Sequence, residues 1–251
     1  MKPERIISPA AQSLLEKLSE VAMRGPLPAV CKGAPAVGMT LLDALGVSYL
    51  STGKPKYQGV AITARRGLAE EGANRVNLFA RVPDWKISTC KSSAEIVSRF
   101  GYDGPSGDKR LFCTVRAARP NAQGLYLTID PSTGLMHEDY QRGGRGERVA
   151  SWQVPALIAR LEAAHPESMW IRATSTIRDG REFLHYRKAV YTASPYIDRF
   201  SGLLADGAIT VDHLIRTSGS VTVEKGPLFK IAPQNLSLLF PTSLVYDLMA
   251  L

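Results

Sequence analysis

The stretch "PKYQGVAITARR", residues 55–66, carries the pattern from which the fold is best predicted. Val60, Ile62 and Ala64 are apolar and alternate with other residue types, which is the period of a half-buried β-strand. Just before the strand, Gly53 and Pro55 are turn formers. We therefore expect a turn followed by a strand over residues 59–65.

Outward from this strand, the hydrophobic pattern changes repeatedly between the helical and the strand period. Helices are predicted over residues 8–23, 40–45, 154–165 and 196–205, and strands over residues 75–82, 110–117, 124–130, 169–177, 182–192, 208–217 and 221–231. An Asp-Gly pair within residues 178–181 predicts a hairpin turn. This mixed order favours an α+β fold over a doubly wound sheet.

A Gly/Arg segment, "QRGGRGER" at residues 141–148, is predicted to be a loop. Its arginines would either follow phosphates as a flexible arm or belong to an ordinary hairpin loop. A boundary here would divide the chain into an N-terminal lobe, residues 1–148, and a C-terminal lobe, residues 149–251.

The charge balance favours a polyanionic partner. The 251 residues include 31 Lys+Arg against 23 Asp+Glu, which gives a net charge of +8. Nucleic acid is the first candidate and an anionic membrane surface the second. The longest uncharged apolar stretch, residues 236–246, is interrupted by Pro241 and is shorter than the ~20 residues that span a bilayer. We expect a soluble, cytoplasmic protein with no membrane partner.

Two other motifs can be set aside. Cys31, Cys90 and Cys113 are odd in number and far apart, which favours reduced thiols over a disulfide framework or a zinc site. The segment "GAPAVGMT", residues 33–40, superficially matches a phosphate-binding loop. Met39 stands where that loop needs lysine, so the segment gives no basis for nucleotide hydrolysis.

Seven blocks along the chain carry a more specific signal. In order they are "KGAPAVGMTLLDALGV", "PKYQGVAITARR", "RVNLFARVPDW", "KSSAEI", "GLYLTID", "GAITVDHLI" and "EKGPLFKI". Together they resemble the MvaI/BcnI restriction endonuclease family from about residue 24 to residue 240. The resemblance implies a PD-(D/E)XK core similar to MutH, with a second lobe embracing the DNA, and Mg²⁺-dependent phosphodiester cleavage by a monomer.

The residues at the expected catalytic positions differ from the family pattern. That pattern has a glutamate on the helix after the glycine loop, an aspartate before the strand, and Glu-x-Lys on the strand. The matching positions here are Leu42, Lys56, Ala61 and Thr63. Mg²⁺ prefers oxygen ligands, chiefly carboxylates, and none stands at these positions. We therefore predict no catalytic residues, no metal and no cofactor, which makes the chain a DNA-binding homologue and not an enzyme.

An active, Mg²⁺-dependent endonuclease is the alternative. It would need relocated carboxylates, and the nearest candidates in the sequence are Asp43, Glu70, Glu71 and Asp84. A third class is a protein-interaction subunit that has lost DNA binding. The net charge and the retained C-terminal blocks argue against that class.

Backbone contacts to duplex DNA are predicted for cations near the strand. Replacing a carboxylate by Lys56 would turn a repulsive position into a phosphate contact. The other candidates are Arg65 and Arg66 on the strand and Arg24 and Lys32 on the preceding loop.

Base recognition is predicted in the C-terminal lobe, because its blocks match the family there. Arginine can bind guanine with two hydrogen bonds, and a carboxylate can accept from cytosine. The candidates are Asp212, His213, Arg216, Lys225 and Lys230. Such a protein could regulate transcription, mark a site for a protein partner, or serve a mobile element or a defence complex.

Overall fold

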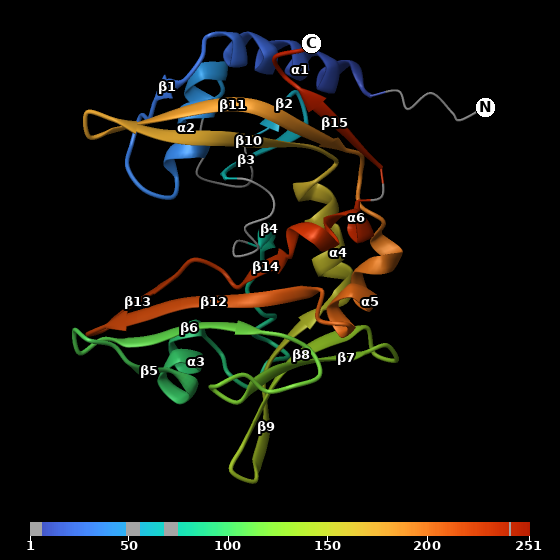
Figure 1. Cartoon of the computed structure of the whole chain (residues 1–251). Coiled ribbons are helices and arrows are strands. Elements are labelled where there is room, and N and C mark those ends of the chain that lie inside the picture. Colours follow the sequence, from blue (N-terminus) through green and yellow to red (C-terminus); the bar gives the residue numbers. More distant parts are fainter. Residues whose placement is uncertain (1–6, 49–55, 68–74, 241) are drawn as a thin grey trace. The chain divides into compact units, whose positions relative to one another are not determined.

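The computed structural model describes residues 7–48, 56–67, 75–240 and 242–251 (Figure 1). The chain divides into two compact units: unit 1 is Met1–Gly72, Ala164–Pro195 and Phe240–Leu251, and unit 2 is Ala73–Ala163 and Tyr196–Leu239. This division differs from the expected lobes 1–148 and 149–251, because each unit collects segments that are distant in sequence. The expected boundary would fall inside a strand of unit 2.

Unit 1 is a six-stranded sheet with two helices on one face. The sheet has the order β1-β11-β10-β3-β2, with β15 also paired to β11. The pairing of β3 with β10 is parallel, and the other pairings are antiparallel. The elements are α1 (Pro9–Met23), β1 (Leu27–Pro28), α2 (Ala36–Leu45), β2 (Lys56–Tyr57), β3 (Val60–Arg66), β10 (Glu167–Arg178), β11 (Arg181–Thr192) and β15 (Ser243–Asp247).

Helix α1 and the sheet enclose the core of unit 1. The helix begins where the Ser8 side chain accepts a hydrogen bond from the Ala11 amide, with Pro9 in the first turn. Its apolar stripe, which includes Leu14 and Leu18, packs with α2 against alternate residues of β3, β10 and β11. The helices therefore cover one face of this sheet, and the opposite face does not pack against them.

Unit 2 contains two further sheets. The larger has the order β4-β14-β12-β6-β5, with β13 paired to β12, and the smaller has the order β7-β8-β9. The strands are β4 (Val76–Ala80), β5 (Tyr102–Asp103), β6 (Lys109–Val115), β7 (Leu125–Asp130), β8 (Leu135–Arg142), β9 (Arg145–Gln153), β12 (Ile209–Ser218), β13 (Val221–Glu224) and β14 (Leu228–Ile231). The helical segments are α3 (Ser93–Phe100), α4 (Val154–Ala164), the 3-10 turn Ile197–Arg199, α5 (Phe200–Ala205), the 3-10 turn Pro233–Asn235 and α6 (Leu236–Leu239).

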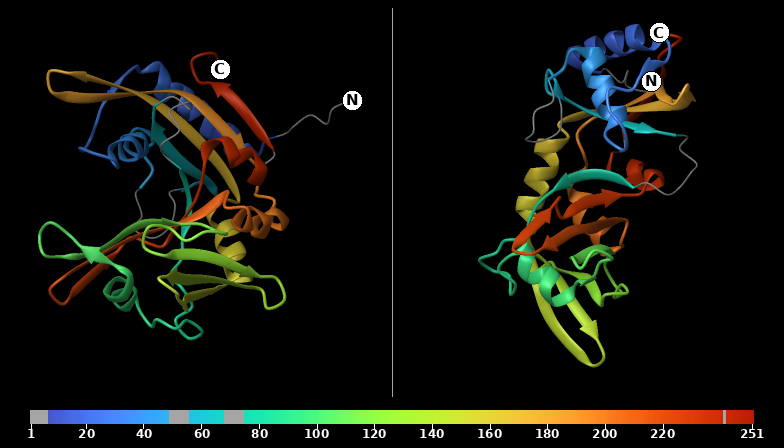
Figure 2. Two further views of the ribbon diagram at one scale, coloured as in Figure 1. Left: turned by 60° about the horizontal axis from the view of Figure 1, so that its bottom comes forward. Right: turned by 90° about the vertical axis from the view of Figure 1, so that its left-hand side faces the viewer.

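The predicted α+β class is confirmed, with local differences. The β10–β11 turn is the expected Asp-Gly hairpin, and both Asp179 and Gly180 have positive φ, as a type I′ turn requires. The Gly/Arg segment forms a β-hairpin: β8 and β9 pair up to Arg142 and Arg145, and the hairpin projects from unit 2 (Figure 2). No helix in the described part of the chain is long and apolar enough to cross a membrane.

Candidate nucleic-acid interface

The two faces of β3 differ in what they contact. Val60, Ile62 and Ala64 belong to the core under α1 and α2. Because side chains alternate along a strand, Ala61, Thr63 and Arg65 point to the opposite face. Glu-x-Lys would occupy that face in the family pattern.

The four residues at the expected catalytic positions do not fit a magnesium ion. Leu42 and Ala61 are buried alkyl groups, with 3% and 0% of their surface exposed. Thr63 offers only a hydroxyl, and its register partner on β10 is the aromatic Trp170. Lys56, on β2, is exposed and positively charged. This donor set provides no carboxylate, which is the ligand a hard divalent cation requires.

The acids considered as replacements are dispersed. Asp43 is exposed on α2 of unit 1, whereas Asp84 belongs to unit 2. Glu70 and Glu71 lie outside the described residues. Within residues 7–48, 56–67, 75–240 and 242–251, no three His, Cys, Asp or Glu side chains gather as metal ligands would.

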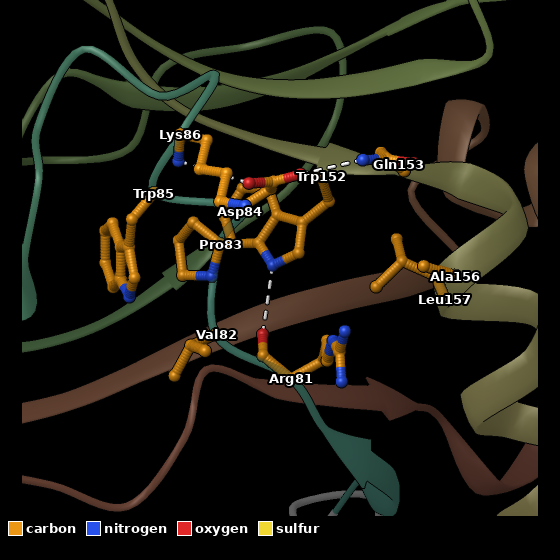
Figure 3. Close-up of a pocket in the computed structure, with 10 residues that line it drawn as sticks. All are labelled: Arg81, Val82, Pro83, Asp84, Trp85, Lys86, Trp152, Gln153, Ala156 and Leu157. Carbon is orange, nitrogen blue, oxygen red and sulfur yellow. Dashed lines mark hydrogen bonds between the residues drawn. The ribbon is translucent and has the colours of Figure 1, made fainter.

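Asp84 is held by residues of unit 2 and lies beside a cavity of about 610 Å³ (Figure 3). Its carboxylate accepts hydrogen bonds from the side-chain amide of Gln153, at 2.7 Å, and from the backbone N–H of Lys86, at 3.1 Å. The Trp152 indole lies against the same cavity and donates to the carbonyl of Arg81. Asp84 therefore has a structural role in holding the segment before α3 onto the end of β9.

Among the strand cations, Arg66 has an internal role that the sequence-based prediction did not include. Its guanidinium donates two hydrogen bonds to Glu182 on β11, at 2.6 and 2.8 Å, and one to the carbonyl of Gly33, at 2.8 Å. The hydrogen bonds that Glu182 accepts from Arg66 and from the Ser175 hydroxyl lower its pKa to about 2. Arg66 thus holds the loop before α2 onto β11, and this internal role replaces the predicted phosphate contact.

The other predicted phosphate contacts of unit 1 lie at the surface or near it. Arg24, at the end of α1, and Lys32, on the loop before α2, are exposed. Arg65 is half-buried. Burial and the neighbouring charge of Arg172 both lower its pKa.

In unit 2, the carboxylate of Asp212 is paired with two cations. Arg75 and Lys230 each form an ion pair with its carboxylate at 2.8 Å, and the Thr114 hydroxyl donates to it at 2.8 Å. Burial opposes ionisation of Asp212, but the bonds from Lys230, Thr114 and Arg75 outweigh it and lower the pKa. The predicted base readers Asp212 and Lys230 are therefore engaged with one another.

His213 is fully buried and pairs with a buried carboxylate. Its Nε2 lies 2.9 Å from Glu138 Oε1, and both side chains are 0% exposed. Burial disfavours the charged imidazolium, yet the Glu138 charge and hydrogen bond outweigh it and raise the pKa of His213. This pair joins β12 to β8 inside unit 2. The prediction that His213 reads a base is corrected, because no base can reach it there.

Arg216 and Lys225 remain exposed. Arg216 on β12 forms an ion pair at 2.7 Å with Asp108, which also binds Arg110 on β6. The hydrogen bond from Arg110, aided by the charge of Arg216, lowers the pKa of Asp108 to about 2. One buried carboxylate thus orients two arginines. Asp108 and Arg110 were not among the predicted residues, although their spacing of two places both on one side of an extended segment.

Comparison with known proteins identifies the family. The sequence profile of the MvaI/BcnI restriction endonuclease family matches residues 15–240. This chain belongs to the MvaI/BcnI restriction endonuclease family. The predicted resemblance is confirmed.

Solved structures show the same fold. A structure of restriction endonuclease MvaI in complex with its cognate DNA substrate has a TM-score of 0.82 and 18% sequence identity, covering 97% of this chain and 100% of that one. A structure of MvaI in the absence of DNA has a TM-score of 0.56 and 17% identity, covering 96% of this chain and 99% of that one. No match was found among curated protein sequences.

Family membership corrects one prediction. The replaced positions led us to expect that the chain is not an enzyme. The family and the matching solved structures are restriction endonucleases, and they overturn that expectation. The side chains at the four substituted positions cannot supply a carboxylate to a metal ion. Family membership nevertheless places the chain among endonucleases.

Proposed function

We propose that this protein binds double-stranded DNA and recognises a short base sequence. The family match over residues 15–240 carries the proposal, and it is supported by a shared fold with MvaI, which was solved with its cognate DNA. The net charge of +8 adds a sequence-independent attraction to the phosphate backbone. A cytoplasmic location belongs to the same proposal.

Exposed or half-buried cations are the proposed contacts. On unit 1 these are Arg24, Lys32, Lys56 and Arg65, and on unit 2 they are Arg216 and Lys225. Arg216 is the best candidate for reading a base, because Asp108 holds its guanidinium and limits the conformational entropy lost on binding. Such binding would support several roles: regulation of transcription, marking of a site for a protein partner, or action in a mobile-element or defence complex.

Titration of a fluorescent duplex in EDTA tests this proposal directly. With about six phosphate contacts, the affinity should fall by roughly 1000-fold between 50 and 200 mM salt. Absence of saturable binding at the lower salt concentration would refute the proposal and favour the protein-interaction class.

The role of Lys56 can be tested with a matched pair of variants. Lys56→Glu should weaken duplex binding by roughly 10-fold or more, because it places an anion where we propose a phosphate. Lys17→Glu changes the net charge equally on α1, which covers the other face of the sheet. Equal affinities of the two variants would rule out a phosphate contact by Lys56.

Endonuclease activity is the second candidate, and family membership favours it. Because Leu42, Lys56, Ala61 and Thr63 do not supply the carboxylates, other acids of the chain would have to do so. Incubation of plasmid DNA with the protein and Mg²⁺, with an EDTA control, tests this candidate. Mg²⁺-dependent linear or nicked product supports it, and intact plasmid at protein excess contradicts it.

A further inference from the structure

Strand β11 contains one extra residue in the middle of its pairing with β10. Arg172 pairs with Lys188 and the next residue, Ala173, pairs with Tyr186, so that Arg187 has no register partner on β10. This is a β-bulge, a feature that bends a strand and redirects its side chains. The Arg187 carbonyl instead accepts a hydrogen bond from the Leu248 amide, at 2.8 Å.

The bulge places two successive cations on the same face of the sheet. Tyr186 and Ala189 both belong to the core under α1 and α2, although they are three residues apart. The two residues between them, Arg187 and Lys188, are both exposed on the opposite face. Without the extra residue, alternation would have turned one of them toward the core.

A third cation joins them from β10. Arg172 lies between the core residues Ile171 and Ala173, and therefore points away from the core as well. Arg172, Arg187 and Lys188 line one cavity of about 250 Å³, together with Gly67, Ala173, Thr174 and Asp247. We name this cavity the bulge cavity.

The charge in the bulge cavity is unbalanced. Three cations line it against one carboxylate, Asp247, which accepts a hydrogen bond from the Met249 amide. Within the described part of the chain, none of the three cations has a carboxylate oxygen within 4.0 Å. An anionic ligand would relieve the repulsion among them.

The bulge cavity lies on the same face as Ala61 and Thr63. Arg65 is the next residue of β3 on that face, and it is the register partner of Arg172. Burial and the charge of Arg172 lower the pKa of Arg65, which is consistent with a crowded cationic surface. The face that would carry acidic ligands in the family pattern therefore continues into a cationic one.

We propose that the bulge cavity binds a phosphate group of DNA, and that Arg172, Arg187 and Lys188 contact this phosphate. This inference rests on the proposed function and adds to it a specific contact on unit 1. Guanidinium groups match the paired oxygens of a phosphate, and lysine adds a point charge. Thr174 lines the same cavity, and its hydroxyl donates to the carbonyl of His185 at 3.4 Å.

Single alanine variants of the two exposed cations test the proposal. Arg187→Ala and Lys188→Ala should each weaken binding of a fluorescent duplex with 5′-hydroxyl ends by roughly 5–10-fold, and should each reduce the slope of log K against log salt by about 0.9. Lys188→Arg should retain the affinity. Lys17→Ala is the matched control, because it removes one charge from α1 on the other face of the sheet. Circular dichroism verifies that each variant is folded.

The outcomes separate this inference from the proposed function. If Arg187→Ala and Lys188→Ala bind 5′-hydroxyl and 5′-phosphorylated duplexes alike as tightly as Lys17→Ala does, the bulge cavity is not a DNA contact, while the proposed function stands. An effect with 5′-hydroxyl duplexes assigns the site to a backbone phosphodiester. An effect that appears only with 5′-phosphorylated duplexes assigns it to a terminal phosphate.

Pyrophosphate provides a second readout if the wild-type chain binds no duplex. The proposal then predicts that sodium pyrophosphate raises the thermal midpoint of the wild type and of Lys17→Ala more than that of Arg187→Ala and Lys188→Ala. That result would support the anion site while the proposed function fails. Equal shifts in all four proteins, or no shift in any, would overturn the inference.

Discussion

Arg65 and Arg66 are adjacent in β3 and have different roles. Arg66 has the same alternation phase as Val60 and Ile62, and its side chain binds Glu182 and the loop before α2. That phase was visible in the sequence, so the inward direction of Arg66 could have been predicted. Its partner Glu182 could not, because nothing in the local pattern relates two residues that are 116 positions apart.

His213 also follows the alternation of its strand. Val211 and Ile215, two residues away on either side, are buried apolar residues, and His213 continues their row. The alternating pattern therefore predicts a buried histidine. The identity of its partner, Glu138, depends on how β8 packs against β12, which is information that the sequence of β12 alone does not contain.

Glu182→Gln should destabilise the folded protein by about 1–2 kcal/mol at pH 7, because it removes the charge that Arg66 pairs with. The pKa of Glu182 is lowered in the folded state, from 4.5 to about 2. The stabilisation is therefore fully present above about pH 5 and is lost as the pH falls toward 2. Urea unfolding of both proteins from pH 7 to pH 2 measures this. A difference that stays constant over the whole range would contradict the assignment.

At the scale of elements, helix α1, strand β3 and the β10–β11 hairpin were predicted from local signals. The helical period of apolar residues, the strand alternation and an Asp-Gly turn each act within a few residues, which is why the sequence reveals them. The bulge at Arg187 was not predicted. It depends on the register between two long strands, and the sequence of β11 alone does not specify that register.

Ser8 links the start of α1 to β10 and offers a test at this scale. Its hydroxyl accepts from the Ala11 amide at 3.1 Å and donates to Glu167 at 2.6 Å. Ser8→Ala should lower the free energy of unfolding by about 1–2 kcal/mol, whereas Ser8→Thr should retain most of it. Chemical denaturation compares the three proteins. Identical transitions for Ser8→Ala and the wild type would show that this cap contributes nothing.

At the scale of the whole molecule, the order of sequence blocks was sufficient to identify the family and the fold class. The division into units was not predictable in the same way. Parallel pairing of β3 with β10 brings together segments on either side of the whole first part of unit 2. Such non-local pairing is set by the packed fold and leaves little trace in local composition.

Sequence recognition is the central claim, and selection of duplexes from a random DNA pool tests it most directly. The full chain is incubated with the pool in EDTA, bound duplexes are amplified over several rounds, and the recovered DNA is sequenced. A parallel incubation in Mg²⁺ shows whether the enriched site is cut. We expect one short motif to be enriched, with selected duplexes binding roughly 1000-fold tighter than the starting pool. A final pool as random as the first would contradict sequence-specific DNA binding by this protein.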